Sequence, residues 1–216
     1  MSWTDRAANH SPSVQRSQAR SVEQARVIIV AAQRLLQESG EGFTTQELAK
    51  EAGVALQTFY RYFAGKDELI LAVIEEAIID GCAEMRSRAE HLDNPLDRLQ
   101  LYVTGAIEAL AGPNPGVPRF ITAEHYRLHQ LFPAELAAAS QAFAEMLLPE
   151  IEAAVETGDL RSTDPATDAW FVTQLSMATF HHYAYVTSTD PITVVAEQLW
   201  AFCLRALGGA SNDGRA

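Results

Sequence analysis

The spacing of apolar residues restricts this chain to one fold class. Along nearly the whole sequence these residues recur at intervals of three and four, as in Val22, Ala25, Ile29, Ala32 and Leu36. Such spacing places apolar side chains on one face of an α-helix. No segment shows the alternation of apolar and polar residues that is typical of a half-buried β-strand. The sequence therefore predicts an all-α protein.

Glycine and proline residues divide this pattern into about nine helices. The expected helices run approximately over 22–39, 44–52, 55–63, 66–90, 95–111, 119–130, 133–157, 166–187 and 191–207. Residues 112–118, with the sequence GPNPGVP, are expected to form a rigid irregular link. Residues 1–20 are polar and show no periodicity, which indicates a disordered arm.

Acidic residues outnumber basic ones, but the excess is confined to the second part of the chain. The 216 residues include 28 acidic and 16 basic residues, a formal net charge of −12. Residues 1–70 contain 8 of each kind, whereas residues 71–216 contain 20 acidic and 8 basic residues. The overall acidity therefore does not exclude nucleic-acid binding by the first part, and the asymmetry suggests two functional parts.

Two short helices separated by a glycine turn follow the first long helix. Thr44 and Glu47 have the spacing of a capping box, in which their side chains satisfy free amides at the start of a helix. Gly53 ends that helix, and the next one is expected at 55–63. Helix, tight turn and short helix together form a helix-turn-helix, which presents its second helix to the DNA major groove.

The second short helix has an outer face that suits DNA. At about 100° per residue, the inward positions are Phe59, Tyr62 and Phe63. The outward positions are Gln57, Tyr60 and Arg61. Core packing does not require an exposed tyrosine, whereas hydroxyl, amide and guanidinium groups donate to DNA phosphates and base edges. The alternative interpretation is an exposed helical hairpin whose polar side chains are ordinary surface residues.

Lys66 stands in the first turn of the following helix, where its charge opposes the helix macrodipole. Asp67 and Glu68, its neighbours, are the residues that the macrodipole favours there. A phosphate bound at this helix end would offset the unfavourable lysine. Lys66 therefore adds to the prediction of a nucleic-acid contact.

Three segments carry a resemblance to a known family. Residues 43–54 (FTTQELAKEAGV), 58–63 (TFYRYF) and 66–69 (KDEL) resemble the amino-terminal signature of the tetracycline-repressor (TetR) family. The resemblance implies a homodimeric, ligand-responsive transcriptional regulator with nine helices. It implies phosphate contacts for Thr45, Tyr60, Tyr62 and Lys66, and positions near base edges for Leu56, Gln57, Thr58 and Arg61. Ala55 stands where many members have a capping serine, and Gln57 where many have glycine.

The resemblance also suggests a division of the chain. We predict an arm at 1–20, a helix-turn-helix DNA-binding domain at 21–65, a helical ligand-binding and dimerisation domain at 66–208 and a flexible tail at 209–216. In this family the last two helices usually pair with those of a second subunit. The candidate dimer residues are Val172, Ser176, Thr179, Tyr183, Val195, Leu199 and Phe202. Packing of these apolar stripes against their own domain is the alternative.

A further stripe of the helix at 166–187 mixes polar and large apolar groups, which is typical of a ligand pocket. The candidate pocket residues are Trp170, Gln174, Met177 and His181, with Tyr102, Phe120, His125 and Phe143 from other helices. A core histidine beside gap-filling methionine is the alternative. The acidic second part and the apolar wall favour a neutral or cationic, largely hydrophobic effector. An anion would need His125, Arg127 or His181 as its partner.

Other kinds of site have little support in the sequence. His125 and His129 share a helical face and could bind a metal, but no third ligand is identifiable. The GxSxG, GxxxxGK[ST] and GxGxxG motifs do not occur, and Cys82 and Cys203 belong to no CxxC pair. We therefore expect no cofactor, no metal and no enzymatic activity. No signal peptide is evident, and no apolar stretch reaches about 18 residues, so we expect a cytoplasmic protein without a membrane partner.

These features predict a repressor that binds a palindromic DNA operator as a homodimer and is released by a small, mainly apolar effector. The alternative is a helical small-molecule-binding or adaptor protein that does not bind DNA. Duplex binding that weakens with salt distinguishes the two, because only DNA binding releases counterions from phosphates.

Overall fold

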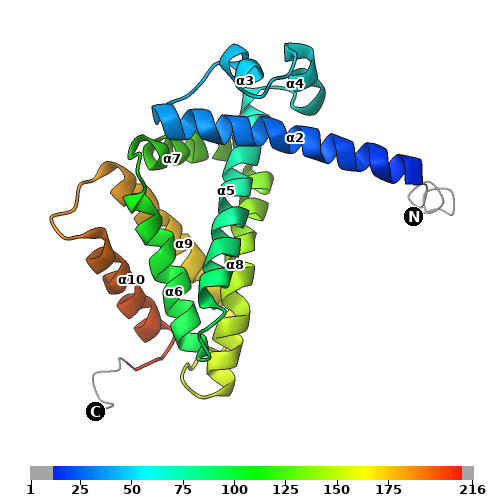
Figure 1. Ribbon diagram of the computed structural model, residues 1–216. Helices are drawn as coiled ribbons and strands as arrows, with labels where there is room; N and C mark the ends of the chain where they lie inside the picture. The colour runs from blue at the N-terminus through cyan, green and yellow to red at the C-terminus, as the bar shows by residue number, and fades with distance from the viewer. Residues whose placement is uncertain (1–11, 211–216) are drawn as a thin grey trace. The chain divides into compact units, whose positions relative to one another are not determined.

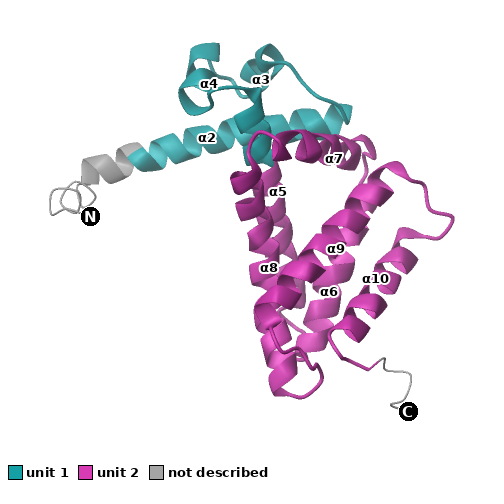
Figure 2. Cartoon of the chain, turned by 180° about the vertical axis from the view of Figure 1, so that it is seen from behind, with its two compact units in different colours: residues 1–73 teal, residues 74–216 magenta. Residues whose placement is uncertain are grey.

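The computed structural model describes residues 12–210, with side chains from residue 18. Over these residues the chain is all-α, as the sequence predicts, with nine α-helices and one short 3-10 helix (Figure 1). The chain divides into two compact units, residues 1–73 and 74–216 (Figure 2). The division falls inside α5 (Lys66–Ala89), later than the boundary expected near residue 65.

Unit 1 contains three helices and the first turns of α5. They are α2 (Pro12–Ser39), α3 (Thr45–Glu51) and α4 (Leu56–Tyr62). Gly40 directly follows α2 and has φ of 66°, a conformation that residues with a side chain rarely adopt. Buried Phe43, Leu48 and Phe59 contribute to the core of this unit.

The first helix begins earlier than expected. α2 starts at Pro12, so residues 12–20, which the sequence suggested to be disordered, are helical; residues 1–11 of that predicted arm lie outside the described residues. Proline suits the first position of a helix, because its missing N–H would have no partner there. Val22 is 68% exposed, and the buried positions of α2 begin only at Ile28. The amino-terminal half of α2 extends past α3 and α4 (Figure 1).

Unit 2 is built from the remaining helices. They are α6 (Pro95–Glu108), η1 (Ala109–Ala111), α7 (Gly116–His129), α8 (Pro133–Glu156), α9 (Pro165–Tyr185) and α10 (Ile192–Ala206). α6 packs against α8, α9 and α10, and α9 also packs against α7 and α8. Leu99, Val103 and Ile107 of α6 are fully buried in the resulting core.

One expected link is partly helical. Residues 116–118, predicted to belong to an irregular segment, form the first turn of α7, with Pro118 buried. A proline is tolerated here because the first amides of a helix have no partner within it. No helix of the described residues is both long and apolar enough to span a membrane.

Arg98 joins α6 to α8 through a partly buried ion pair. Its Nη2 lies 2.8 Å from Oε2 of Glu150, and its Nε donates to the same oxygen at 2.8 Å. Its Nη1 donates to the carbonyl oxygens of Leu92 and Asp93, at 2.8 and 3.0 Å. The side chain thus ties α6, α8 and the α5–α6 loop together.

Arg98→Ala should lower the free energy of unfolding by about 2 kcal/mol, because Glu150 would stay partly buried without its cation. Urea denaturation measures this loss. Arg34→Ala is the control, since Arg34 lies 3.9 Å from Glu51 with 67% of its side chain exposed. Exposed pairs contribute at most about 1 kcal/mol. Equal losses in the two variants would contradict the structural role of Arg98.

Candidate functional site

The first candidate site is the helix pair α3–α4 of unit 1. The capping box is present: the Thr44 amide donates to Oε2 of Glu47 at 2.7 Å, and the Glu47 amide donates to Oγ1 of Thr44 at 3.2 Å. The Thr44 hydroxyl also donates to Oε2 of Glu47, at 2.8 Å, and the two hydrogen bonds that this carboxylate accepts from Thr44 hold the pKa of Glu47 below its usual value. Gly53 follows α3 with φ of 64°, which allows the tight turn toward α4. The predicted helix-turn-helix is therefore confirmed.

Aromatic packing fixes the orientation of α4. Phe59 and Phe63 are buried with ring centroids 5.9 Å apart, and Tyr60 meets the Phe59 ring edge-on at 4.9 Å. Tyr62, predicted to face inward, is half-buried. The side of α4 that carries Phe59 is thus packed against the core of unit 1. The opposite side faces solvent, with Tyr60 53% exposed and Gln57 exposed beside it.

The predicted DNA-contacting residues all lie on α3, α4 or the start of α5. Exposed are Leu56, Gln57, Tyr60 and Arg61, and half-buried are Thr45, Thr58, Tyr62 and Lys66. The guanidinium of Arg61 donates to the Tyr62 hydroxyl at 3.1 Å and lies 4.9 Å from the centre of its ring. The Lys66 ammonium lies 5.1 Å from the centre of the Phe43 ring. Amide, hydroxyl and cationic groups thus share one short segment, a set that can bind phosphates and base edges.

The predicted dimer residues lie mostly inside unit 2. Val172, Ser176, Val195 and Leu199 are buried in the chain's own fold, Thr179 and Tyr183 are half-buried, and Phe202 is exposed. These four side chains therefore pack inside their own subunit and leave little surface for a second one. Both helices are apolar nearly all round, so periodicity alone did not show which face is inside.

A different set of α9 and α10 residues is exposed. We define the α9–α10 apolar residues as Phe171, Ala178, Tyr185, Val194 and Phe202. The three on α9 are spaced by seven and lie on one side of the helix. Exposed fractions of 58% for Phe171 and 54% for Phe202 are large for aromatic residues of this size. Of these residues, only Phe202 is among the dimer residues predicted from the sequence.

The predicted pocket residues do not all face the interior. Tyr102, Phe143 and His181 are buried, and Phe120, His125, Gln174 and Met177 are half-buried. Trp170 is 48% exposed, whereas its neighbour Ala169 is buried, so the tryptophan lies on the solvent side of α9 and is not enclosed by unit 2. Tyr102 and Phe143 belong to the main core of unit 2.

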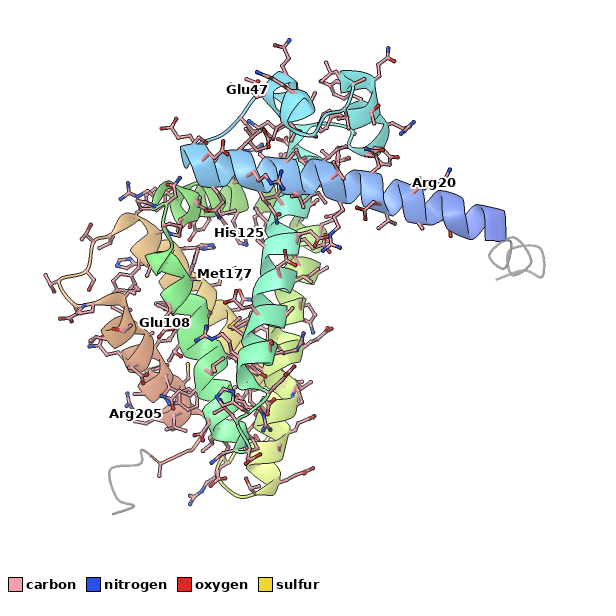
Figure 3. All side chains as sticks on the ribbon, in the orientation of Figure 1. Arg20, Glu47, Glu108, His125, Met177 and Arg205 are labelled. Carbon is pink, nitrogen blue, oxygen red and sulfur yellow. The ribbon has the colours of Figure 1, made fainter. Side chains whose placement is uncertain are left out.

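Polar groups meet where α7 packs against α9. The ring centroids of His125 and His181 lie 4.7 Å apart, and Figure 3 marks His125 on α7 and Met177 on α9. Thr122, one turn before His125, is buried, and neither its Oγ1 nor Nδ1 of His125 has a hydrogen-bond partner. We call Thr122, His125 and His181 the α7–α9 polar cluster. Thr122 was not predicted, because nothing in the sequence distinguishes it from other helical threonines.

A pocket of about 320 Å³ lies in unit 2 at the start of α7 and the end of α9. It is formed by residues between 110 and 119 and between 183 and 192, and it contains one predicted residue, the dimer candidate Tyr183. Arg119 Nε donates to the carbonyl of Ala184 at 3.1 Å, and the Tyr185 hydroxyl donates to the carbonyl of Arg119 at 2.9 Å. These bonds join the start of α7 to the end of α9.

His125 and His129, considered as metal ligands, have ring centroids 6.2 Å apart. Within residues 12–210, no three histidine, cysteine or carboxylate side chains are grouped so that they could hold a metal ion. The neighbourhood of His125 is therefore best described by hydrogen bonding and packing.

Comparison with known proteins agrees with this arrangement. Residues 28–73 match the model of bacterial regulatory proteins of the tetR family. A 47-residue segment, 22% of this chain, is 38% identical to YvaF of Bacillus subtilis (strain 168), an uncharacterised HTH-type transcriptional regulator. The match covers 25% of that relative's length.

Solved structures resemble the chain over most of its length. RolR in complex with resorcinol has a TM-score of 0.69 at 17% identity, covering 92% of this chain and 94% of RolR. AibR in complex with isovaleryl coenzyme A and operator DNA has a TM-score of 0.53 at 22% identity, covering 87% of this chain and 100% of AibR. The helix-turn-helix of residues 28–73 is therefore that of the TetR family of transcriptional regulators, and the chain as a whole shares the fold of these solved structures.

Proposed function

We propose that the protein is a repressor that binds a palindromic DNA operator as a homodimer and is released by a small, mainly apolar effector. The observation that carries the proposal is the exposed side of α4, where Gln57, Tyr60 and Arg61 project from a helix anchored by Phe59. A short helix held in this way presents donors without having to order them on binding. The AibR structure, which contains operator DNA, supports the same use of this fold.

Charge placement supports DNA binding by unit 1. The 8 acidic and 8 basic residues of 1–70 cancel, while the rest of the chain carries the excess of 12 acidic residues. DNA is a polyanion. Its phosphates would therefore repel the acidic residues 71–216, whereas residues 1–70, with no net charge, could approach them. Arg61 lies on the exposed side of α4, and Lys66, the next cation along the chain, is the first residue of α5. A regulator with a DNA operator would act in the cytoplasm.

A second copy of the chain would cover the α9–α10 apolar residues. Exposed aromatic side chains of this number are uncommon on a monomer and are typical of an interaction surface. A two-fold axis would place the same residues of both copies against each other and form a four-helix interface. The same axis would place two α4 helices against successive turns of a palindromic site.

The effector would bind in unit 2, in the region of the α7–α9 polar cluster. RolR with resorcinol and AibR with isovaleryl coenzyme A show that proteins of this fold bind small molecules. An effector could favour a distance between the two α4 helices of the dimer that does not fit the operator. It would then weaken DNA binding, and DNA would weaken effector binding by the same factor.

Lys66→Ala should weaken binding to every duplex by a similar factor and reduce the slope of log K against log salt by about 1, because one phosphate contact is lost. Fluorescence anisotropy of a labelled duplex at several salt concentrations measures the slope. Lys50→Ala is the control, since Lys50 is exposed at the end of α3 and outside the predicted contacts. An unchanged slope would remove Lys66 from the phosphate contacts. If the wild-type protein does not bind duplex at low salt, the protein is instead a ligand-binding or adaptor protein.

A further inference from the structure

Two polar atoms on one side of α7 are buried without a partner. Thr122 is 1% exposed and its Oγ1 has no hydrogen-bond partner, and neither does the buried Nδ1 of His125, one helical turn later. A buried polar atom without a partner destabilises a protein, and most are therefore satisfied. Two such atoms one turn apart need a physical explanation.

Other buried threonines in unit 2 satisfy their hydroxyl within the helix. Thr104 donates to the carbonyl of Gln100 at 2.9 Å, and Thr173 donates to that of Ala169 at 2.8 Å. Each bond reaches the carbonyl four residues earlier, which is the usual solution for a helical threonine. Thr122 does not make this bond. Its hydroxyl is therefore available to a group from outside the helix.

His181 of α9 is buried, and the centroid of its ring lies 4.7 Å from that of His125. Burial, and to a smaller extent the nearby His125, lower the pKa of His181 to about 4, and burial also lowers the pKa of His125. Both imidazoles are thus neutral at pH 7. A neutral imidazole offers one N–H donor and one nitrogen acceptor, and a hydroxyl both donates and accepts.

Charged side chains of α7 and α9 are already engaged. Glu124 accepts from Nε and Nη2 of Arg127, at 2.9 and 2.6 Å. Arg119 keeps its charge, but its Nε is bound to the carbonyl of Ala184, and Asp168, the one acidic residue of α9, accepts from Ser162. A charged ligand brought to the α7–α9 polar cluster would lose its water without gaining an opposite charge from the three neutral side chains of the cluster, which is costly.

We propose that the effector is a neutral molecule whose hydroxyl or carbonyl group hydrogen-bonds to Thr122 and His125 beside His181. The inference rests on the effector-responsive function proposed above and narrows its ligand to one chemical class. Carboxylates and phosphates, for which the sequence offered His125, Arg127 or His181 as partners, are then excluded as effectors. Cationic compounds, which the acidic residues of unit 2 would attract at long range, are excluded as well.

The first test needs no ligand. Thr122→Val keeps the shape of the side chain and removes the unpartnered hydroxyl, so the ligand-free protein should melt about 2 to 6 °C higher. Thr104→Val is the matched control: it removes a hydroxyl that has a partner, and its melting temperature should not rise. A lower melting temperature for Thr122→Val would show that the hydroxyl already has a structural role and would overturn the inference.

The second test uses four probes of one ring size: phenol, toluene, benzoate and benzylammonium, each at millimolar concentration. A ligand stabilises the folded state by mass action, so phenol should raise the melting temperature of the wild-type protein more than toluene does. Benzoate and benzylammonium should have no effect. Thr122→Val and His125→Phe should reduce the phenol response to the toluene level, whereas His129→Phe, one turn further on an exposed position, should keep it.

Three outcomes of the probe series would overturn the inference: stabilisation by a charged probe, an unchanged phenol response in the two variants, or no stabilisation by phenol. Duplex binding is measured on the same wild-type sample. If the protein binds DNA but fails the probe series, the regulatory function stands and the ligand class is wrong. If phenol stabilises the protein through Thr122 and no DNA is bound, the site stands and the regulatory function is wrong.

Discussion

Phe202→Glu should convert the protein from a dimer to a folded monomer. Phe202 is 54% exposed on α10, so the substitution leaves the core of unit 2 intact. In a two-fold interface each copy would contribute one buried carboxylate, and two unpaired charges would have to lose their water together. Sedimentation velocity at micromolar concentration measures the change, and circular dichroism shows that the helices remain. DNA binding should be lost with the dimer.

Two further variants make this result specific. Leu131→Glu introduces the same charge at an exposed leucine outside the α9–α10 apolar residues, and it should remain a dimer. Leu199→Glu places the charge in the core and should unfold the protein instead of producing a monomer. A wild-type protein that sediments as a monomer, or a Phe202→Glu variant that remains dimeric, would contradict the proposed interface.

Gln57→Ala should relax sequence preference at one position of each half-site and cost about 1 to 3 kcal/mol there, because glutamine can bind adenine with two hydrogen bonds. Gln57 is exposed on the first turn of α4, where side chains of a recognition helix meet base edges. Competition binding against duplexes that carry each base pair at each position measures the effect.

Tyr60→Phe supplies the contrast. Its hydroxyl is predicted to bind a phosphate, so its loss should weaken all duplexes about equally. If Gln57→Ala also weakens all sequences equally, Gln57 contacts the backbone. If it weakens none, α4 does not read the site through this residue.

Short-range signals made unit 1 predictable from the sequence. The capping box of Thr44 and Glu47, the positive φ of Gly53 and the buried Phe59 each depend on a few neighbouring residues, and all are present in the structure. The start of α2 was missed because residues 12–20 have no apolar periodicity, although nothing among them prevents a helix. Periodicity reports one buried face, and an exposed helical segment has none.

Unit 2 was less predictable because its interfaces join residues far apart in the chain. The helices α9 and α10 were located correctly, but Val172 and Leu199 proved to be core residues and Phe171 an exposed one. The sequence of a helix that is apolar on most sides predicts that the helix is buried. It does not predict which sides pack against the same subunit and which against another one. The missing partner of Thr122 is a property of the assembled fold in the same way.

The most direct test of the proposed function is to let the protein select the sequences it binds from a pool of random duplex oligonucleotides. If two α4 helices related by a two-fold axis read successive major grooves, the selected sites should be palindromes with half-sites about 34 Å, one helical turn, apart. Recovery of a single asymmetric motif, or of no enriched sequence, would contradict a homodimeric regulator that uses α4 for recognition.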